Sequence, residues 1–123
     1  MSWDFMNEEF SRERHIFIPN TYTVEDIFAH IEHTMKSETM KSEYAREYTD
    51  GWIGEPMGNQ IGIINLEFGD QEQQIEVYIY EGVDSKNRLA VDGDAIHEDY
   101  AEWSNASMDT FESVVNCLKE LEH

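Results

Sequence analysis

The stretch of sequence with the most potential for chemistry is VDGDAIHEDYAEW, at residues 91–103. It combines five carboxylates with two large aromatic side chains and contains no lysine or arginine; its notable members are Asp92, Asp94, Glu98, Asp99, Tyr100, Glu102 and Trp103. Such a group of acids is compatible with a metal-binding loop, a catalytic cluster, a solvated surface, or a surface that binds a basic partner. The rest of the sequence bears on this choice.

The segment does not fit the calcium-binding loop of an EF-hand. A loop beginning at Asp92 would need an acid or Asn at its fifth residue, Gly at its sixth and Glu at its twelfth. Those positions hold Ile96, His97 and Trp103. We therefore expect no EF-hand calcium site here.

Two histidines and the single cysteine are further residues that could bind a metal. His30 and His33 are three residues apart, whereas the strong zinc motif spaces its histidines four apart, and no third ligand is indicated. We interpret both as exposed surface histidines. Cys117 is the single cysteine, which excludes an internal disulfide and a cysteine-based zinc knuckle, so we interpret it as a small packing residue. The sequence therefore predicts no metal and no cofactor.

One pattern is faintly similar to metal-dependent nucleases. Asp70 is followed by Asp84, Ser85 and Lys86, but Lys86 falls in a predicted turn of a strongly acidic chain, whereas those nucleases carry the lysine on a strand beside a basic groove. The sequence also lacks a G-x-S-x-G motif and a phosphate-binding loop. We expect that the protein is not an enzyme.

The charge of the chain limits its partners. Twenty-seven acids against 8 bases give a net charge of -19, which repels nucleic acid and anionic membranes and attracts cations. Residues 1–13 lack the pattern of a secretory signal, and no stretch has the length of a membrane span. We expect a cytoplasmic protein with a basic protein partner and no direct contact with nucleic acid or membrane; the alternative is that the charge only provides solubility.

The length of 123 residues and a hydrophobic content of 40% predict one folded domain over residues 1–123. Residues 121–123, LEH, resemble the start of a vector-encoded histidine tag and are given no function. A strand is predicted at 15–18, and Thr23 with Asp26 approximates a capping box that begins a helix. The segment 36–50 is predicted to be helical, because Met40, Tyr44 and Tyr48 recur at every fourth residue.

The middle of the chain predicts a loop and then a hairpin. The loop, residues 51–60, carries Trp52 as either a binding aromatic or a buried anchor. The hairpin joins strands 61–68 and 75–80, with Glu76, Tyr78 and Tyr80 on the face opposite the apolar residues Ile61, Ile63, Leu66, Ile75, Val77 and Ile79. A third short strand at 88–91 follows, and the acidic stretch leaves it directly.

The last element is an amphipathic helix. Ser107 or Asp109 is its expected N-cap, and its apolar stripe consists of Met108, Phe111, Val114, Val115, Leu118 and Leu121. The predicted fold is α+β, an antiparallel sheet of three to four strands with helices packed on one face.

Tyr100 and Trp103 favour a partner-binding role for the acidic stretch, because interfaces use such side chains as anchors beside complementary charge. The alternative is that both rings are buried under the last helix. If residues 91–103 do not bind the partner, the next candidates are the face of Glu76, Tyr78 and Tyr80 and the Trp52 loop.

The hairpin IGIINLEFGDQEQQIEVYIY and the closing helix WSNASMDTFESVVNCLKEL give residues 61–121 an organisation that resembles bacterial immunity proteins of contact-dependent growth inhibition and polymorphic toxin systems. The resemblance implies a protein that neutralises a cognate toxin, often a nuclease, by covering its basic surface. It assigns no individual site residue. The alternative is a phage-encoded nucleic-acid mimic that inhibits a restriction or CRISPR machine.

Overall fold

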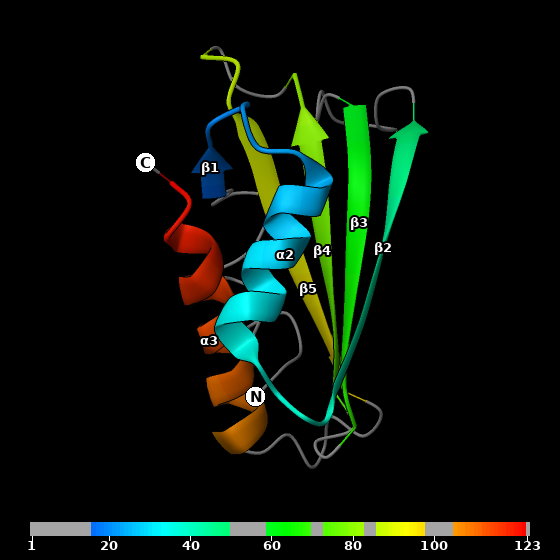
Figure 1. Cartoon of the computed structure of the whole chain (residues 1–123), viewed down its shortest axis with the longest axis vertical. Helices are drawn as coiled ribbons and strands as arrows, with labels where there is room; N and C mark the ends of the chain where they lie inside the picture. Colours follow the sequence, from blue (N-terminus) through cyan, green and yellow to red (C-terminus); the bar gives the residue numbers. More distant parts are fainter. Residues whose placement is uncertain (1–15, 50–58, 70–72, 83–85, 98–104, 123) are drawn as a thin grey trace.

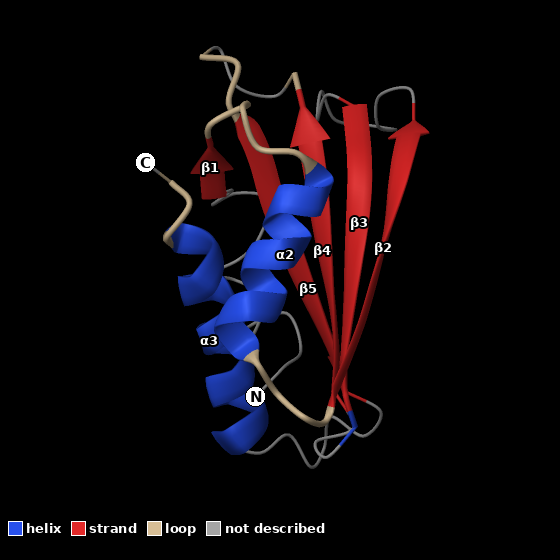
Figure 2. Cartoon of the chain, in the orientation of Figure 1, coloured by secondary structure: helices blue, strands red, loops and turns tan. Residues whose placement is uncertain are grey.

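A computed structural model describes residues 16–49, 59–69, 73–82, 86–97 and 105–122. Its elements, in chain order, are β1 (Ile16–Ile18), α2 (Val24–Met35), β2 (Met40–Thr49), β3 (Asn59–Phe68), β4 (Gln73–Glu81), β5 (Leu89–His97) and α3 (Asn105–Lys119). Both helices lie side by side on one face of the sheet (Figure 1). The helices and the strands form two separate layers (Figure 2), which confirms the predicted α+β class.

The sheet has five strands in the order β1-β5-β4-β3-β2, and every neighbouring pair is antiparallel. The prediction of three to four strands is therefore wrong in the number of strands, whereas the predicted antiparallel pairing is confirmed. The additional strand is β2, which the sequence pattern assigned to a helix. The predicted strand at 88–91 is also too short, since β5 extends to His97.

The helical prediction for residues 36–50 is wrong because a spacing of four residues is a multiple of the two-residue repeat of a strand as well as close to one helical turn. Helix α2 ends where Lys36 adopts the left-handed conformation, with φ 37°, and its N–H bonds to the carbonyl of Glu32. The chain then pairs with β3 from Met40 opposite Phe68 onward. Pairing with β3 therefore decides the conformation of this segment.

The hydrophobic core lies between the helices and the sheet. On β4 the predicted alternation is confirmed, because Ile75, Val77 and Ile79 are fully buried. On β3 the buried core residues are Ile64, Leu66 and Phe68, of which Leu66 agrees with the expectation. Of the other two expected residues, Ile61 is half-buried and packs against the core, whereas Ile63 is not part of it. The run IGII is apolar at both odd and even positions, so its pattern does not define which face is buried, and the register shifts between Gln60 and Gly62.

The start of α2 follows the sequence signal closely. The Oγ1 atom of Thr23 accepts a hydrogen bond from the Asp26 backbone N–H at 3.1 Å, and an Asp26 carboxylate oxygen accepts one from the Thr23 N–H at 2.9 Å. This reciprocal pair is the predicted capping box. The helix then buries Val24, Ile27 and Ile31 on the stripe that faces the sheet.

The prediction for α3 is correct in its buried face and wrong in its start. The helix begins at Asn105, before the expected caps Ser107 and Asp109. Residues 105–107 contain no glycine or proline that would prevent a helix. The buried residues of the predicted stripe are Phe111, Val114, Val115, Leu118 and Leu121, while the side chain of Met108 lies outside the described part of the chain.

Several contacts fix α2 on β2 and β3. A Cβ atom at Gly62 would lie 2.5 Å from a methyl group of Val24, so glycine permits the helix to approach β3 closely. Arg46 on β2 forms two hydrogen bonds with Glu25, one of them from Nη2 to Oε2 at 2.7 Å. The Ser42 hydroxyl donates to Glu32 at 2.8 Å. These exposed polar contacts join α2 to the edge strand β2 and add little to stability compared with the buried packing at Gly62.

Candidate functional site

The candidate site lies on the sheet face opposite the helices, which we call the outer face. On β4 the side chains that alternate with the core are Glu76, Tyr78 and Tyr80, and all three are half-buried. This position confirms the prediction that they face away from the isoleucines. Neither described helix lies over this face (Figure 1).

The pairing of β5 with β4 brings two residues of the acidic stretch to the same face. Asp92 lies opposite Tyr78 and Asp94 lies opposite Glu76 in the antiparallel register. These two acids belong to β5 itself, which corrects the expectation that the acidic stretch leaves the strand at Val91. Two acids of the first candidate surface therefore share one face of the sheet with the second candidate, Glu76, Tyr78 and Tyr80.

Hydrogen bonds orient two of these carboxylates. The hydroxyl of Tyr78 donates to Oε2 of Glu76, two residues earlier on the same strand, at 3.0 Å. The backbone N–H of Gly93 donates to Oδ1 of Asp92 at 2.9 Å. Both acids are only half-buried, so they keep exposed surface while their rotamers are restrained.

A row of polar residues crosses four strands of the outer face. The register aligns Asp94, Glu76, Asn65 and Glu43 on β5, β4, β3 and β2. The Asn65 side-chain oxygen is buried and has no hydrogen-bond partner among the described residues. Acidic residues at directly opposite positions destabilise a sheet, as do buried polar atoms without partners. This row therefore lowers the stability of the sheet. Its residues are for that reason candidates for a role in binding.

The edge of the outer face beside β1 has a different character. Phe17 on β1, Ala90 on β5 and Tyr80 on β4 form one cross-strand row. Ala90 is fully buried although it lies on the outer face, and the Arg88 guanidinium lies 4.8 Å from the centroid of the Phe17 ring. The outer face thus has an aromatic end next to an acidic centre.

The other predicted site residues fall outside the part of the chain that the structure describes. These are Glu98, Asp99, Tyr100, Glu102 and Trp103, together with Trp52 of the predicted loop. Asp70, Asp84 and Ser85 of the nuclease-like pattern also lie outside it, while Lys86 is exposed in a turn, as expected.

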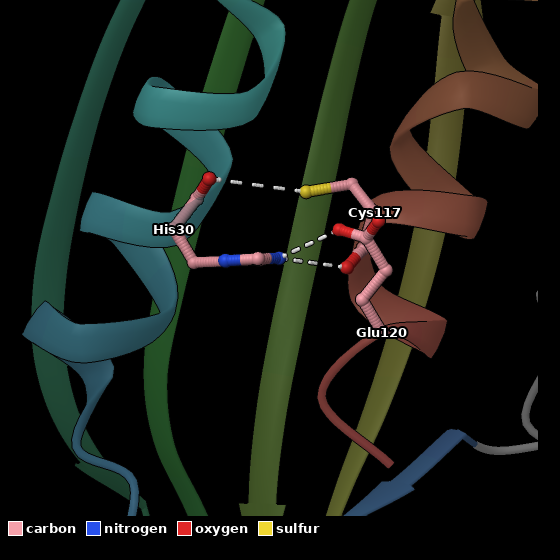
Figure 3. A group of neighbouring side chains, drawn as sticks. All are labelled: His30, Cys117 and Glu120. Atoms are coloured by element: carbon pink, nitrogen blue, oxygen red, sulfur yellow. Dashed lines mark hydrogen bonds and ion pairs between the residues drawn. The ribbon is translucent and has the colours of Figure 1, made fainter. Parts of the chain in front are cut away.

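The structure also brings together a group that sequence reasoning missed. His30 on α2 lies against Cys117 on α3 and Glu120 just after it, and one ligand atom from each residue lies within 4.8 Å of the other two (Figure 3). His30 Nε2 is 3.0 Å from the Cys117 carbonyl oxygen and 3.1 Å from Oε1 of Glu120. The expectation of an exposed histidine is therefore wrong for His30, which is half-buried, and right for His33.

Cys117 is buried between the helices, in agreement with its interpretation as a packing residue. Burial raises the pKa of its thiol, and the neighbouring Glu120 carboxylate acts in the same direction. A neutral thiol is a poor nucleophile, so the surroundings of Cys117 do not activate it for covalent catalysis.

Comparison with protein-family models, with curated proteins and with solved structures finds no match for this chain. Within the described residues, neither helix combines the length and the apolar character that a membrane span requires. The geometry of the outer face is therefore the basis for a functional proposal.

Proposed function

We propose that the chain is an acidic binding protein that neutralises a cognate toxin, a nuclease, through the outer face of its sheet. The observation that carries the proposal is the register of β5 against β4, in which Asp92 and Asp94 lie opposite Tyr78 and Glu76. One surface thereby combines carboxylates with aromatic rings on rigid strands. Interfaces with basic proteins need both, charge for the encounter and aromatic contacts for a long-lived complex.

The proposed mechanism is occlusion. A nuclease binds phosphates with lysine and arginine side chains, and carboxylates held on strands can take the positions of those phosphates. The net charge of -19 directs a basic partner toward the chain over distances near the Debye length. Once bound, the half-buried rings of Tyr78 and Tyr80 lose water against the partner and slow its dissociation.

A nucleic-acid mimic that inhibits a restriction or CRISPR machine is the second candidate. One observation favours it: Asp92 and Asp94 are two residues apart on a strand, so their Cα atoms are roughly 7 Å apart, a separation similar to that of successive phosphates along a nucleic-acid strand. The two candidates use the same surface and differ in the partner. Identification of the protein captured from the native source distinguishes a toxin from a DNA-binding defence enzyme.

The test of the surface is a measurement of association kinetics with the captured partner. The triple variant Glu76→Gln, Asp92→Asn, Asp94→Asn removes the negative charges that β4 and β5 bring together in the middle of the outer face. The control variant Glu38→Gln, Glu112→Gln, Glu122→Gln removes the same charge from exposed acids away from that face. We expect the first variant to slow association about tenfold or more at low salt, and the control variant to slow it much less.

Equal effects of the two variants would show that net charge alone attracts the partner, and would remove the outer face as its binding surface. Circular dichroism and thermal melts of both variants establish that each is folded. Replacement of Tyr78 by Ala adds a separate test, because loss of an anchor increases the dissociation rate more than it reduces the association rate.

A further inference from the structure

The group formed by His30, Cys117 and Glu120 lies at the junction of the two helices, on the side of the molecule away from the outer face (Figures 1 and 3). Cys117 is 2% exposed, while the side chains of His30 and Glu120 are 27% and 60% exposed. The group therefore has a buried sulfur, an imidazole at the boundary and a carboxylate open to water.

From this geometry we propose that His30, Cys117 and Glu120 bind a zinc ion that joins α2 to α3. A thiolate, an imidazole nitrogen and a carboxylate oxygen form a ligand set that zinc accepts. Hard cations such as Mg²⁺ and Ca²⁺ prefer oxygen ligands and do not favour the sulfur. Three protein ligands leave the fourth tetrahedral position for water.

The separations between the three ligand atoms fit a zinc site if these atoms move slightly closer together. Ligand atoms about 2.0 to 2.3 Å from a tetrahedral zinc ion lie roughly 3.5 Å from one another. The three ligand atoms here already lie within 4.8 Å of one another, with His30 Nε2 and Glu120 Oε1 at 3.1 Å. Because the nitrogen and the oxygen are already this close, the required movement brings them nearer to the Cys117 sulfur, and the exposed side chain of Glu120 is free to rotate toward it.

Zinc binding requires a change of protonation in two ligands. Without metal, His30 Nε2 is placed to donate a hydrogen to the Cys117 carbonyl and to Glu120, and the Cys117 sulfur lies 4.0 Å from the His30 carbonyl. With metal, the Nε2 lone pair and the thiolate bind the ion. The imidazole proton moves to Nδ1 and the thiol proton passes to solvent, so about one proton is released per zinc bound.

The alternative is a purely structural contact. The Cys117 carbonyl lies in the last turn of α3, where helix carbonyls lack partners within the helix, and the Leu121 N–H bonds to Leu118 instead. The His30 ring would then serve only to cap that carbonyl. The two roles predict different results for a substitution that keeps a donor and removes the metal ligand.

The experiment titrates the full chain, without any polyhistidine extension, with Co²⁺ in the presence of excess Mg²⁺. The magnesium occupies the many surface carboxylates, and a cobalt-thiolate charge-transfer band reports binding to Cys117 alone. We expect one equivalent of Co²⁺ to produce the band and one equivalent of Zn²⁺ to abolish it. Zinc at about a hundred times its Kd should also raise the Tm by roughly 5 °C or more.

Variants separate the metal site from the structural contact. His30→Gln keeps an N–H donor for the Cys117 carbonyl but should weaken Zn²⁺ binding at least tenfold, and Cys117→Ser should abolish the band. The matched control His33→Gln removes an exposed histidine from the same helix and should change neither measurement. Circular dichroism before metal addition shows whether each variant is folded.

Absence of a cobalt-thiolate band in the folded wild-type chain would overturn the proposal, as would unchanged Zn²⁺ affinity in folded His30→Gln. Either result would leave His30 with a capping role. Neither result bears on the outer face, whose test measures partner kinetics in other variants.

Discussion

The two faces of the sheet carry different kinds of side chain although the same strands form both faces. The face under the helices buries mainly apolar side chains, such as Ile75, Val77 and Ile79 on β4, together with Gln73 at the start of that strand. The outer face of the same strand carries Glu76 and two tyrosines, with Asp92 and Asp94 on the neighbouring strand. The first arrangement maximises hydrophobic stabilisation, whereas the second places acids next to one another at a cost in stability. Under the proposed function, stability and partner binding depend on different faces of one sheet.

The largest expected loss of stability comes from the helix side. Phe111 on α3 is 2% exposed, so Phe111→Ala should lower the free energy of unfolding by about 3 to 5 kcal/mol, because it removes a buried ring and leaves a cavity. The adjacent and exposed Glu112 is the control, and Glu112→Ala should change stability by less than about 0.5 kcal/mol. Phe28→Ala should cost less than Phe111→Ala, since Phe28 is half-buried against Tyr44. Urea denaturation measures all three.

The comparison of the two faces is sharpest within β4 itself. Ile75→Ala should lower the free energy of unfolding by about 2 to 5 kcal/mol, because Ile75 is fully buried. Gln74→Ala, at the adjacent and exposed position, should change it by less than about 0.5 kcal/mol. Similar losses in the two variants, measured by urea denaturation, would contradict the assignment of the faces.

A smaller effect is expected where α2 approaches β3. Gly62→Ala should destabilise by about 1 to 3 kcal/mol, because its new methyl group would lie 2.5 Å from Val24. Gly69 provides the control, since a Cβ atom there would meet only the Thr39 carbonyl oxygen at 3.9 Å. Addition of Val24→Ala to the Gly62→Ala variant should recover part of the loss, and a double-mutant cycle quantifies the coupling. Additive effects would show that the helix does not depend on this contact.

The smallest expected effect concerns the exposed pair that joins α2 to the edge strand β2. The hydrogen bonds from Arg46 lower the pKa of Glu25 from 4.5 to about 2. Since the folded state has the lower pKa, the pair stabilises the fold above about pH 4.5 and its contribution is lost as the pH falls toward 2. In an NMR titration, Arg46→Gln should return the Glu25 pKa toward 4.5, and Lys41→Gln should leave it unchanged.

The sequence by itself determined those features that depend on neighbouring residues. Thr23 and Asp26 form their capping box within one turn, so the start of α2 is readable locally. The strict alternation of β4 defines its two faces, and the 3.6-residue repeat of α3 defines its buried stripe. Each of these patterns needs no partner from elsewhere in the chain to be interpreted.

The tertiary structure decided everything that depends on pairing between distant segments. The segment from Met40 to Thr49 is a strand because β3 supplies its hydrogen-bond partners, although its apolar spacing also suits a helix. The acids of β5 join the tyrosine face only through the register with β4. His30 meets residues 87 and 90 positions away in the sequence, a contact that no local spacing encodes, because only the packing of α2 against α3 brings the side chains together.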